Sequence, residues 1–187
     1  MPAPGKKWRH VIINTRGSWL HGDERGFRSR RHRIHSSGDY KHRPPQGEHE
    51  GLLRYRIGRS SPEVHLDADL RPTIGRTLVR ELRESGHVVL VVAVGKVHAH
   101  LLVELPDNII KVKAILGQAK RKASRGVKAR MPGQIWSRGG TFKPINSRDH
   151  QLRVYEYVLF GQGPEAWTWS FKDGSDEGCF GRPRPAR

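Results

Sequence analysis

Two apolar segments in the middle of the chain place the strongest constraint on its fold. Residues 87–94 (HVVLVVAV) and 97–105 (VHAHLLVEL) are rich in valine and leucine, and only Gly95 and Lys96 separate them. A two-residue connection with glycine between two such segments is typical of a β-hairpin. We therefore expect an antiparallel strand pair at the centre of the fold. Its longest apolar run, 88–94, is far too short to cross a bilayer.

The rest of the chain alternates strand and helix signals around this hairpin. Apolar periodicity and turn residues predict a strand over 8–15, helices over 72–85 and 107–123, a strand or hairpin over 134–145, and a last helix over 149–160. For the second helix, Asp107 is the expected cap, and the expected apolar residues are Ile110, Ala114, Ile115 and Leu116. This order indicates an α+β fold with an antiparallel sheet and helices on one face.

The charge of the chain is unusually positive and unevenly distributed. Lys and Arg number 35 against 18 Asp and Glu, which gives a formal net charge of +17. Residues 1–60 (14 basic, 5 acidic) and 107–147 (10 basic, 1 acidic) each carry +9. The segment 61–106, which contains the hairpin, is close to neutral. Two basic blocks around a neutral core favour a polyanionic partner, with nucleic acid as the first candidate.

Several protein classes are disfavoured by the same composition. Cys179 is the only cysteine, so an internal disulfide or a cysteine-based zinc site is not expected. The first residues lack the apolar stretch of a secretory signal. We expect a cytoplasmic protein that does not associate with a membrane.

Residues 16–62 differ from the rest of the chain. They are rich in Arg, His, Ser, Gly and Pro, and they show almost no apolar periodicity. A long loop-rich segment of this kind inside a domain is uncommon and often functional. We predict a main domain over 1–162, with 16–62 as a basic insertion, followed by a C-terminal tail over 163–187.

His98 and His100 form the most informative pair on the predicted strands. Alternate residues of a strand share a face, so these two imidazoles point the same way as Leu102. Two imidazoles about 7 Å apart can hold one divalent cation when a third ligand is supplied. The alternative is two ordinary, partly exposed histidines, but polar residues in the middle of an apolar strand pair need a reason.

The last predicted helix contains two tyrosines with different surroundings. The 100° step of an α-helix places Tyr155 within the apolar arc and Tyr157 on the opposite side, roughly in line with His150. Tyr157 is then either a surface aromatic or a free hydroxyl. A tyrosine hydroxyl can attack a DNA phosphodiester to give a covalent phosphotyrosine. A free phenol has a pKa near ~10, so such a nucleophile needs help to lose its proton.

Three segments carry a resemblance to a known family. KVHAHLLV (96–103), IWSRGG (135–140) and VYEYVLFGQ (154–162) are similar to the His-hydrophobic-His strand, the Trp-containing strand and the nucleophile helix of single-tyrosine HUH transposases of small bacterial insertion sequences. The REP-associated tyrosine transposases are relatives of these, and WTWS (167–170) resembles a Trp-Ser segment in that branch. The resemblance covers about 8–15 and 71–162, and leaves out the insertion and the tail.

The resemblance implies a fold, a reaction and a set of residues. It implies a ferredoxin-like sheet, usually in a homodimer in which the nucleophile helix completes the partner's site. It makes Tyr157 the nucleophile, with His98, His100 and Gln162 as ligands of Mg²⁺ or Mn²⁺. The implied activity is DNA transposition: cleavage of single-stranded DNA beside hairpins, with a 5′-phosphotyrosine and a free 3′-OH, followed by rejoining.

The chain departs from the family pattern around the third ligand. The family glutamine follows the tyrosine by four residues, whereas Gln162 follows Tyr157 by five. A continued helix would turn Gln162 away from Tyr157, unless Gly161 breaks it. His150, two turns before Tyr157, is the alternative third ligand.

The second basic block supplies the expected DNA contacts. These are Lys111, Lys113, Lys120, Arg121, Lys122 and Arg138. The same charge supports an alternative function, a non-catalytic or domesticated nucleic-acid-binding protein. A relaxase or replication initiator, which would share the two-histidine metal site, is disfavoured because the chain is short and has no Gly-rich Lys-Ser/Thr loop.

Overall fold

The computed structural model describes residues 2–27, 35–37, 44–60, 62–173 and 178–180. The chain divides into two units. The larger one comprises Met1–Thr15 together with His65–Arg187, and the smaller one is Arg16–Val64. The smaller unit contains residues 16–62, whose assignment as an insertion stays a prediction.

The larger unit is built on one antiparallel sheet. Its strands are β1 (Lys6–Asn14), β2 (Val89–Val94), β3 (His98–Pro106), β4 (Thr141–Pro144), β5 (Trp167–Ser170) and β6 (Cys179–Phe180). They lie in the order β4-β1-β3-β2-β5-β6, and every neighbouring pair is antiparallel. The predicted hairpin is confirmed as β2 and β3, with the Gly95 N–H donating to the His98 carbonyl at 2.9 Å.

The connections between these strands give a ferredoxin-like arrangement. The helices are α2 (Arg71–Glu84, preceded by a 3-10 turn at Ala68–Leu70), α3 (Ile109–Gly126) and α4 (Arg148–Phe160). The chain runs β1-α2-β2-β3-α3-β4, and these four strands stand in the order 4-1-3-2 in the sheet. The predicted α+β class with an antiparallel sheet is confirmed.

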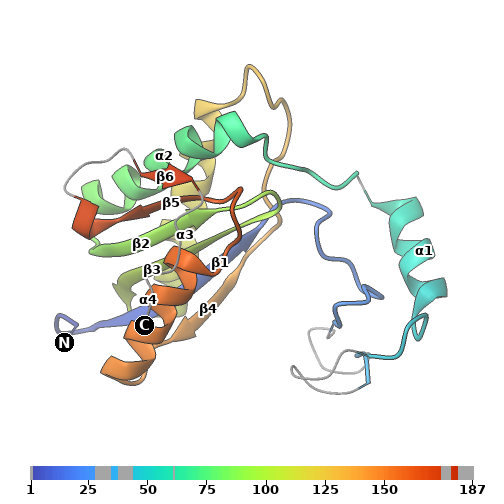
Figure 1. Cartoon of the computed structure of the whole chain (residues 1–187), viewed down its shortest axis with the longest axis horizontal. Coiled ribbons are helices and arrows are strands. Elements are labelled where there is room, and N and C mark those ends of the chain that lie inside the picture. Colours follow the sequence, from blue (N-terminus) through green and yellow to red (C-terminus); the bar gives the residue numbers. More distant parts are fainter. Residues whose placement is uncertain (1, 28–34, 38–43, 61, 174–177, 181–187) are drawn as a thin grey trace. The chain divides into compact units, whose positions relative to one another are not determined.

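Helices cover both faces of the sheet, whereas the sequence predicts helices on one face. In Figure 1, α2 and α3 lie behind the sheet and α4 crosses in front of it. The side chain of Leu102 is buried on the α4 face, where it packs with Val154, Val158 and Leu159. The central strands are therefore apolar on both faces, and an apolar face exposed to water would be costly, so α4 is needed to cover the second one.

Strand β5 lies in the segment for which the sequence predicts a tail. It pairs with β2, and Trp167 and Trp169 are buried. The indole of Trp167 lies directly over Gly75 of α2, where a Cβ atom would stand 1.8 Å from the ring. The glycine in the middle of α2 thus has a packing reason, because only a residue without a side chain admits this ring.

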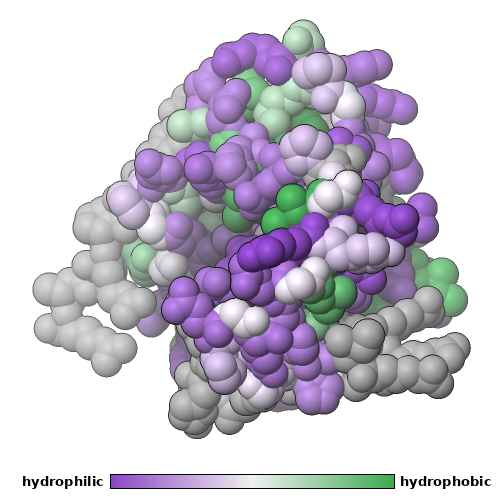
Figure 2. Space-filling model, turned by 90° about the vertical axis from the view of Figure 1, so that its right-hand side faces the viewer, coloured by the Kyte–Doolittle hydropathy of each residue, from purple (hydrophilic) through white to green (hydrophobic). Residues whose placement is uncertain are grey.

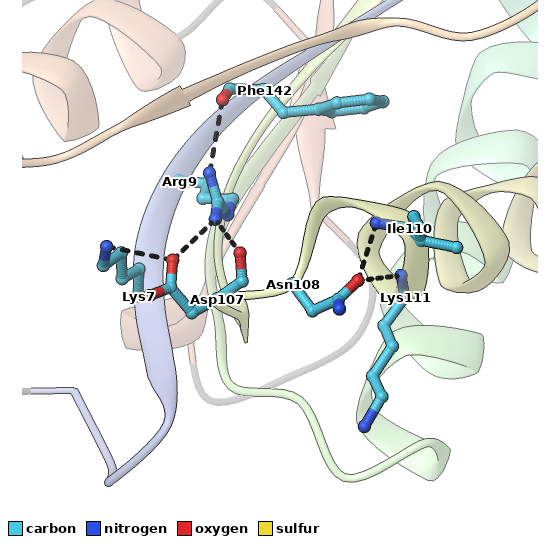
Figure 3. Close-up of polar contacts among 7 residues, drawn as sticks. All are labelled: Lys7, Arg9, Asp107, Asn108, Ile110, Lys111 and Phe142. Carbon is cyan, nitrogen blue, oxygen red and sulfur yellow. Dashed lines mark hydrogen bonds and ion pairs between the residues drawn. The ribbon is translucent and has the colours of Figure 1, made fainter.

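The cap of helix α3 is Asn108, one residue later than the predicted Asp107. The Asn108 side chain accepts hydrogen bonds from the N–H groups of Ile110 and Lys111 (Figure 3). The Asp107 carboxylate instead lies 2.9 Å from Lys7 Nζ and 3.4 Å from an Arg9 guanidinium nitrogen, which ties the helix start to β1 (Figure 3).

The buried face of α3 also differs from the predicted one. The prediction for Leu116 is confirmed and Ile115 is partly buried, but Ala114 is exposed and Ile110 is 74% exposed. The buried side chains instead repeat at helical spacing from a different starting point, as Val112, Leu116, Ala119, Lys120 and Ala123. The physical reason is that α3 contacts both α2 and β3, and this packing decides which side of the helix is buried.

The smaller unit contains a helix that the sequence does not indicate. This helix, α1 (Glu50–Arg59), has no buried residue and a weak apolar face, so periodicity could not identify it. Phe27 is buried in this unit, stacked on the ring of His21 and edge-on to the ring of His49.

The surface of the molecule agrees with its composition. On the face shown in Figure 2, hydrophilic residues predominate and hydrophobic ones form small separate patches. Among the described residues, none of the helices has the length and apolar character that a membrane span requires.

Candidate functional site

Two histidines from neighbouring strands share a hydrogen bond on the α4 face of the sheet. In the β1–β3 register, Ile12 stands opposite His100 and His10 opposite Leu102, which puts His10 and His100 on one face as diagonal neighbours. Nε2 of His10 lies 2.9 Å from Nδ1 of His100, and the rings stack with centroids 5.2 Å apart. Both are almost fully buried, at 8% and 5% exposed.

His98 lies beside this pair on the same face. Its ring is nearly perpendicular to that of His100, with the centroids 4.8 Å apart. The expected placement of His98 and His100 on one face of β3 is thus realised. Their role as metal ligands stays a prediction.

Tyr157 lies against the two buried histidines. Helix α4 buries Val154 and Val158 against the sheet. Tyr157 lies at the edge of this sheet-facing side, and not on the opposite, outward side that the helical spacing predicts, because the histidines that it contacts are on the sheet face that α4 covers. The Tyr157 ring contacts those of His100 and His10 edge-on, with centroids 5.5 and 5.9 Å apart, and the residue remains 46% exposed.

The surroundings keep both buried imidazoles uncharged. Burial lowers the pKa of His10 from 6.5 to about 4, with smaller contributions from the charges of Lys143 and His150. Burial lowers the pKa of His100 to about 3, with contributions from His98, His10 and Lys143. Near neutral pH each ring therefore carries one N–H and one lone pair, which is the form that binds metals.

A divalent cation fits the two histidines of β3 by the chemistry of their donors. His98 and His100 offer imidazole nitrogens from adjoining rings, and the protonation of His100 is suppressed. No group of three or more His, Cys, Asp and Glu arranged to hold a metal occurs within the described part of the chain. The remaining coordination positions would fall to water or to a substrate phosphate, which Mg²⁺ commonly uses.

The two candidates for a third ligand, Gln162 and His150, each make a hydrogen bond at an end of α4. The Gln162 side chain donates to the Tyr157 carbonyl at 3.1 Å and closes the end of α4, together with the N–H of Gly161 at 2.9 Å. Nδ1 of His150 accepts from the Asn146 N–H at 3.5 Å at the start of the same helix. Gly161 is the residue after the helix, in keeping with the expected break.

The expected DNA-contacting residues fall into two groups. Lys120 is 9% exposed and its ammonium group donates to the carbonyls of Ser137 and Gly139, at 2.6 and 2.8 Å. Burial lowers its pKa to about 8. The other members of the set have exposed side chains: Lys111, Lys113, Arg121, Lys122 and Arg138. Lys122 also lies 3.8 Å from Glu81 of α2.

Sequence reasoning missed two residues of this site, His10 and Lys143. Lys143 of β4 stands opposite His10 of β1, so both belong to the same face. His10 sits in an apolar strand, the same signal that singles out His98 and His100. The sequence alone does not pair it with them, because the register between β1 and β3 joins residues 90 positions apart.

Comparisons with known proteins give a limited result. No family model matches the chain, and no curated protein matches it in sequence. Among solved structures, the chain is similar to the REP-associated tyrosine transposase bound to a REP hairpin. The identity is 15% and the TM-score 0.41, over 85% of this chain and 67% of that chain. A likeness at this level transfers no residue role from one chain to the other.

Proposed function

We propose that this protein is a single-tyrosine HUH transposase that cleaves and rejoins single-stranded DNA through Tyr157. The observation that carries the proposal is the contact between Tyr157 and His100, with ring centroids 5.5 Å apart. Two residues selected separately, one as a nucleophile and one as a metal ligand, are 57 positions apart in sequence and adjacent in space. The strongly positive charge supports a polyanionic substrate.

The reaction follows from the chemistry of a tyrosine nucleophile. The Tyr157 oxygen attacks the phosphorus of a phosphodiester, and the bond between phosphorus and the 3′ oxygen breaks. The phenol proton is lost, and the departing 3′ oxygen gains a proton to become a free 3′-OH. The product is a 5′-phosphotyrosine, which keeps the energy of the broken bond, so that a 3′-OH can reverse the step and join strands.

The histidines and lysines of the site have separate proposed roles. His98 and His100 would hold Mg²⁺ or Mn²⁺, which supplies polarisation of the scissile phosphate when it is bound. Lys143, on the same face as His10, adds positive charge close to where a phosphate would lie. The exposed cations of 111–138 would hold the DNA backbone. Hairpin-bearing ends as substrate and a homodimeric state are part of the proposal through the family resemblance.

A binding protein without chemistry is the second candidate function. It is supported by the same positive charge, which accounts for nucleic-acid binding without any chemistry. Such a protein would bind nucleic acid with an affinity that falls steeply with ionic strength. It would cleave no DNA with any divalent metal.

A covalent-adduct assay distinguishes these functions. The full chain is incubated with Mn²⁺ and labelled single-stranded DNA that carries a hairpin, and the products are separated under denaturing conditions. We expect a protein–DNA adduct that requires the metal and that Tyr157→Phe abolishes. Tyr155→Phe on the same helix is the matched control and should retain the adduct, because the Tyr155 hydroxyl bonds Ser170 on the β5 side of the helix.

Each outcome of this assay decides one of the assignments. Adduct in Tyr157→Phe would refute the nucleophile assignment. DNA binding without adduct, across a series of hairpin substrates and metals, would favour the binding protein.

A further inference from the structure

The hydrogen bond between His10 and His100 couples the hydrogen positions of the two rings. It joins Nε2 of His10 to Nδ1 of His100 at 2.9 Å in a buried setting. A neutral imidazole has one N–H and one lone pair. One of the two bonded nitrogens must therefore carry a hydrogen and the other a lone pair, and this choice decides what the remaining nitrogen of each ring presents.

Two arrangements satisfy this bond, and they differ at Nε2 of His100. If His10 donates, His100 has its hydrogen on Nε2, which then cannot bind a cation. If His100 donates from Nδ1, its Nε2 has a lone pair. Within the described residues, the hydrogen bond of the His100 ring to His10 is made by Nδ1, so Nε2 is the nitrogen that a cation would bind.

We propose that His10 is a positioning residue, which accepts the Nδ1 hydrogen of His100 and so keeps the Nε2 lone pair of His100 available to a divalent cation. This rests on the proposed function, since it assigns the second contact of a proposed metal ligand. Histidine ligands commonly donate their other ring hydrogen to a fixed acceptor, which sets the tautomer and the ring orientation.

The setting of His10 supports a role of this kind. His10 lies on β1 opposite the fully buried Leu102, where an aliphatic residue would bury at no electrostatic cost. The imidazole is nevertheless there, and its Nε2 is bonded to His100. The stacked rings also restrict the His100 ring to one orientation toward His98.

The test begins with the metal-free full chain. Proton–nitrogen NMR correlations of ¹⁵N-labelled protein report which ring nitrogen of each histidine carries hydrogen, and the signals that disappear in His100→Gln identify His100. We expect His100 to carry its hydrogen on Nδ1, and we expect Mg²⁺ to shift its Nε2 signal. A hydrogen on Nε2 that persists when Mg²⁺ is added would overturn the proposal.

Variants at position 10 provide the second measurement. Mn²⁺ affinity, followed by the decrease of the free-ion EPR signal, should fall about 10–100-fold in His10→Phe, which keeps the ring but not the acceptor. In His10→Gln, the amide oxygen can accept from Nδ1 and should restore much of the affinity. His87→Phe, a change at another buried histidine, is the control and should bind Mn²⁺ as the wild type does. Wild-type affinity in His10→Phe would overturn the proposal.

These readouts are independent of DNA cleavage. A protein with the expected tautomer and metal binding, but without covalent adduct, would refute the proposed function and leave the role of His10 intact. A protein that forms the Tyr157 adduct but carries the His100 hydrogen on Nε2 would refute the role of His10 and leave the proposed function intact.

Discussion

The ring of Tyr157 packs edge-on against that of His100 within a single chain, with centroids 5.5 Å apart. The family resemblance implies a site shared between two subunits, with the nucleophile helix of one completing the site of the other. The geometry found here instead brings the tyrosine and the histidines together without a second chain. This contact and the packing around it lead to testable expectations.

A mixing experiment tests whether the site is built within one chain. Tyr157→Phe is mixed with the double variant His98→Ala and His100→Ala, each inactive by itself. We expect the mixture to form no covalent adduct, because neither chain has a complete set. Measurable adduct in the mixture would mean that a two-fold dimer exchanges the helix between subunits.

Gly161 lies close to the backbone and the ring of Tyr157. A Cβ at position 161 would stand 2.7 Å from the Tyr157 carbonyl oxygen and 3.0 Å from Cδ2 of the ring. We expect Gly161→Ala to reduce the rate of adduct formation by up to about 100-fold, because a displacement near 1 Å has effects of that size. The control is Gly163→Ala, since the structure has open space around that position and any change there reports only backbone strain.

The buried histidine pair makes stability depend on pH. The folded-state pKa values of His10 and His100, about 4 and about 3, lie below the ordinary value of 6.5. At pH values between the folded and the ordinary pKa, the unfolded chain therefore binds more protons than the folded chain. The free energy of unfolding should therefore fall as pH decreases from 6.5 toward 4, by on the order of 3 kcal/mol for one such shift. Urea unfolding of metal-free protein across this range measures the effect.

His10→Gln gives the comparison for this pH dependence. It removes one of the two titrating rings, so its decrease in stability between pH 6.5 and 4 should be clearly smaller than that of the wild type. An identical decrease in both proteins would show that other groups cause it.

Exposed and buried lysines of α3 should behave differently toward DNA. For Lys111→Gln and Lys113→Gln, the slope of log K against log salt concentration for single-stranded DNA should decrease by about 0.7 for each phosphate that the variant no longer neutralises. Lys120→Gln should leave that slope nearly unchanged. It should instead lower the free energy of unfolding by about 1–3 kcal/mol, because the carbonyls of Ser137 and Gly139 lose their donor. Binding measured at several salt concentrations, with thermal unfolding of each variant, checks both.

Substitutions at two helix glycines distinguish the effect of side-chain packing on stability from the effect of helix propensity. Gly75→Ala should destabilise the protein by about 1–3 kcal/mol or more, because its Cβ would overlap the buried Trp167 ring. Gly117→Ala in α3 meets only the end of the flexible Arg121 side chain, at 3.5 Å. It should be neutral or stabilise the protein by up to about 1 kcal/mol. Equal effects of the two substitutions on the unfolding midpoint would contradict this packing.

Local patterns in the sequence were enough for the central elements. The hairpin of β2 and β3 follows from two apolar runs around Gly95 and Lys96, and the buried face of α2 follows from helical spacing. Both depend on residues close together in the chain. Tyr157 is different, because helical spacing predicts an outward ring, whereas the packing of α4 on the sheet places the ring against His10 and His100.

Contacts between distant segments were decided only by the tertiary structure. The register of β1 against β3 makes His10 the partner of His100, and the pairing of β5 with β2 places Trp167 over Gly75. The packing of the fold, and not the residue type, buries the Lys120 side chain. The same packing buries the two imidazoles and so keeps them uncharged. The sequence by itself determined the elements and the chemical groups they carry. How the strands align and which groups are shielded from water depend on the packing of the whole sheet and its helices, so only the fold could decide them.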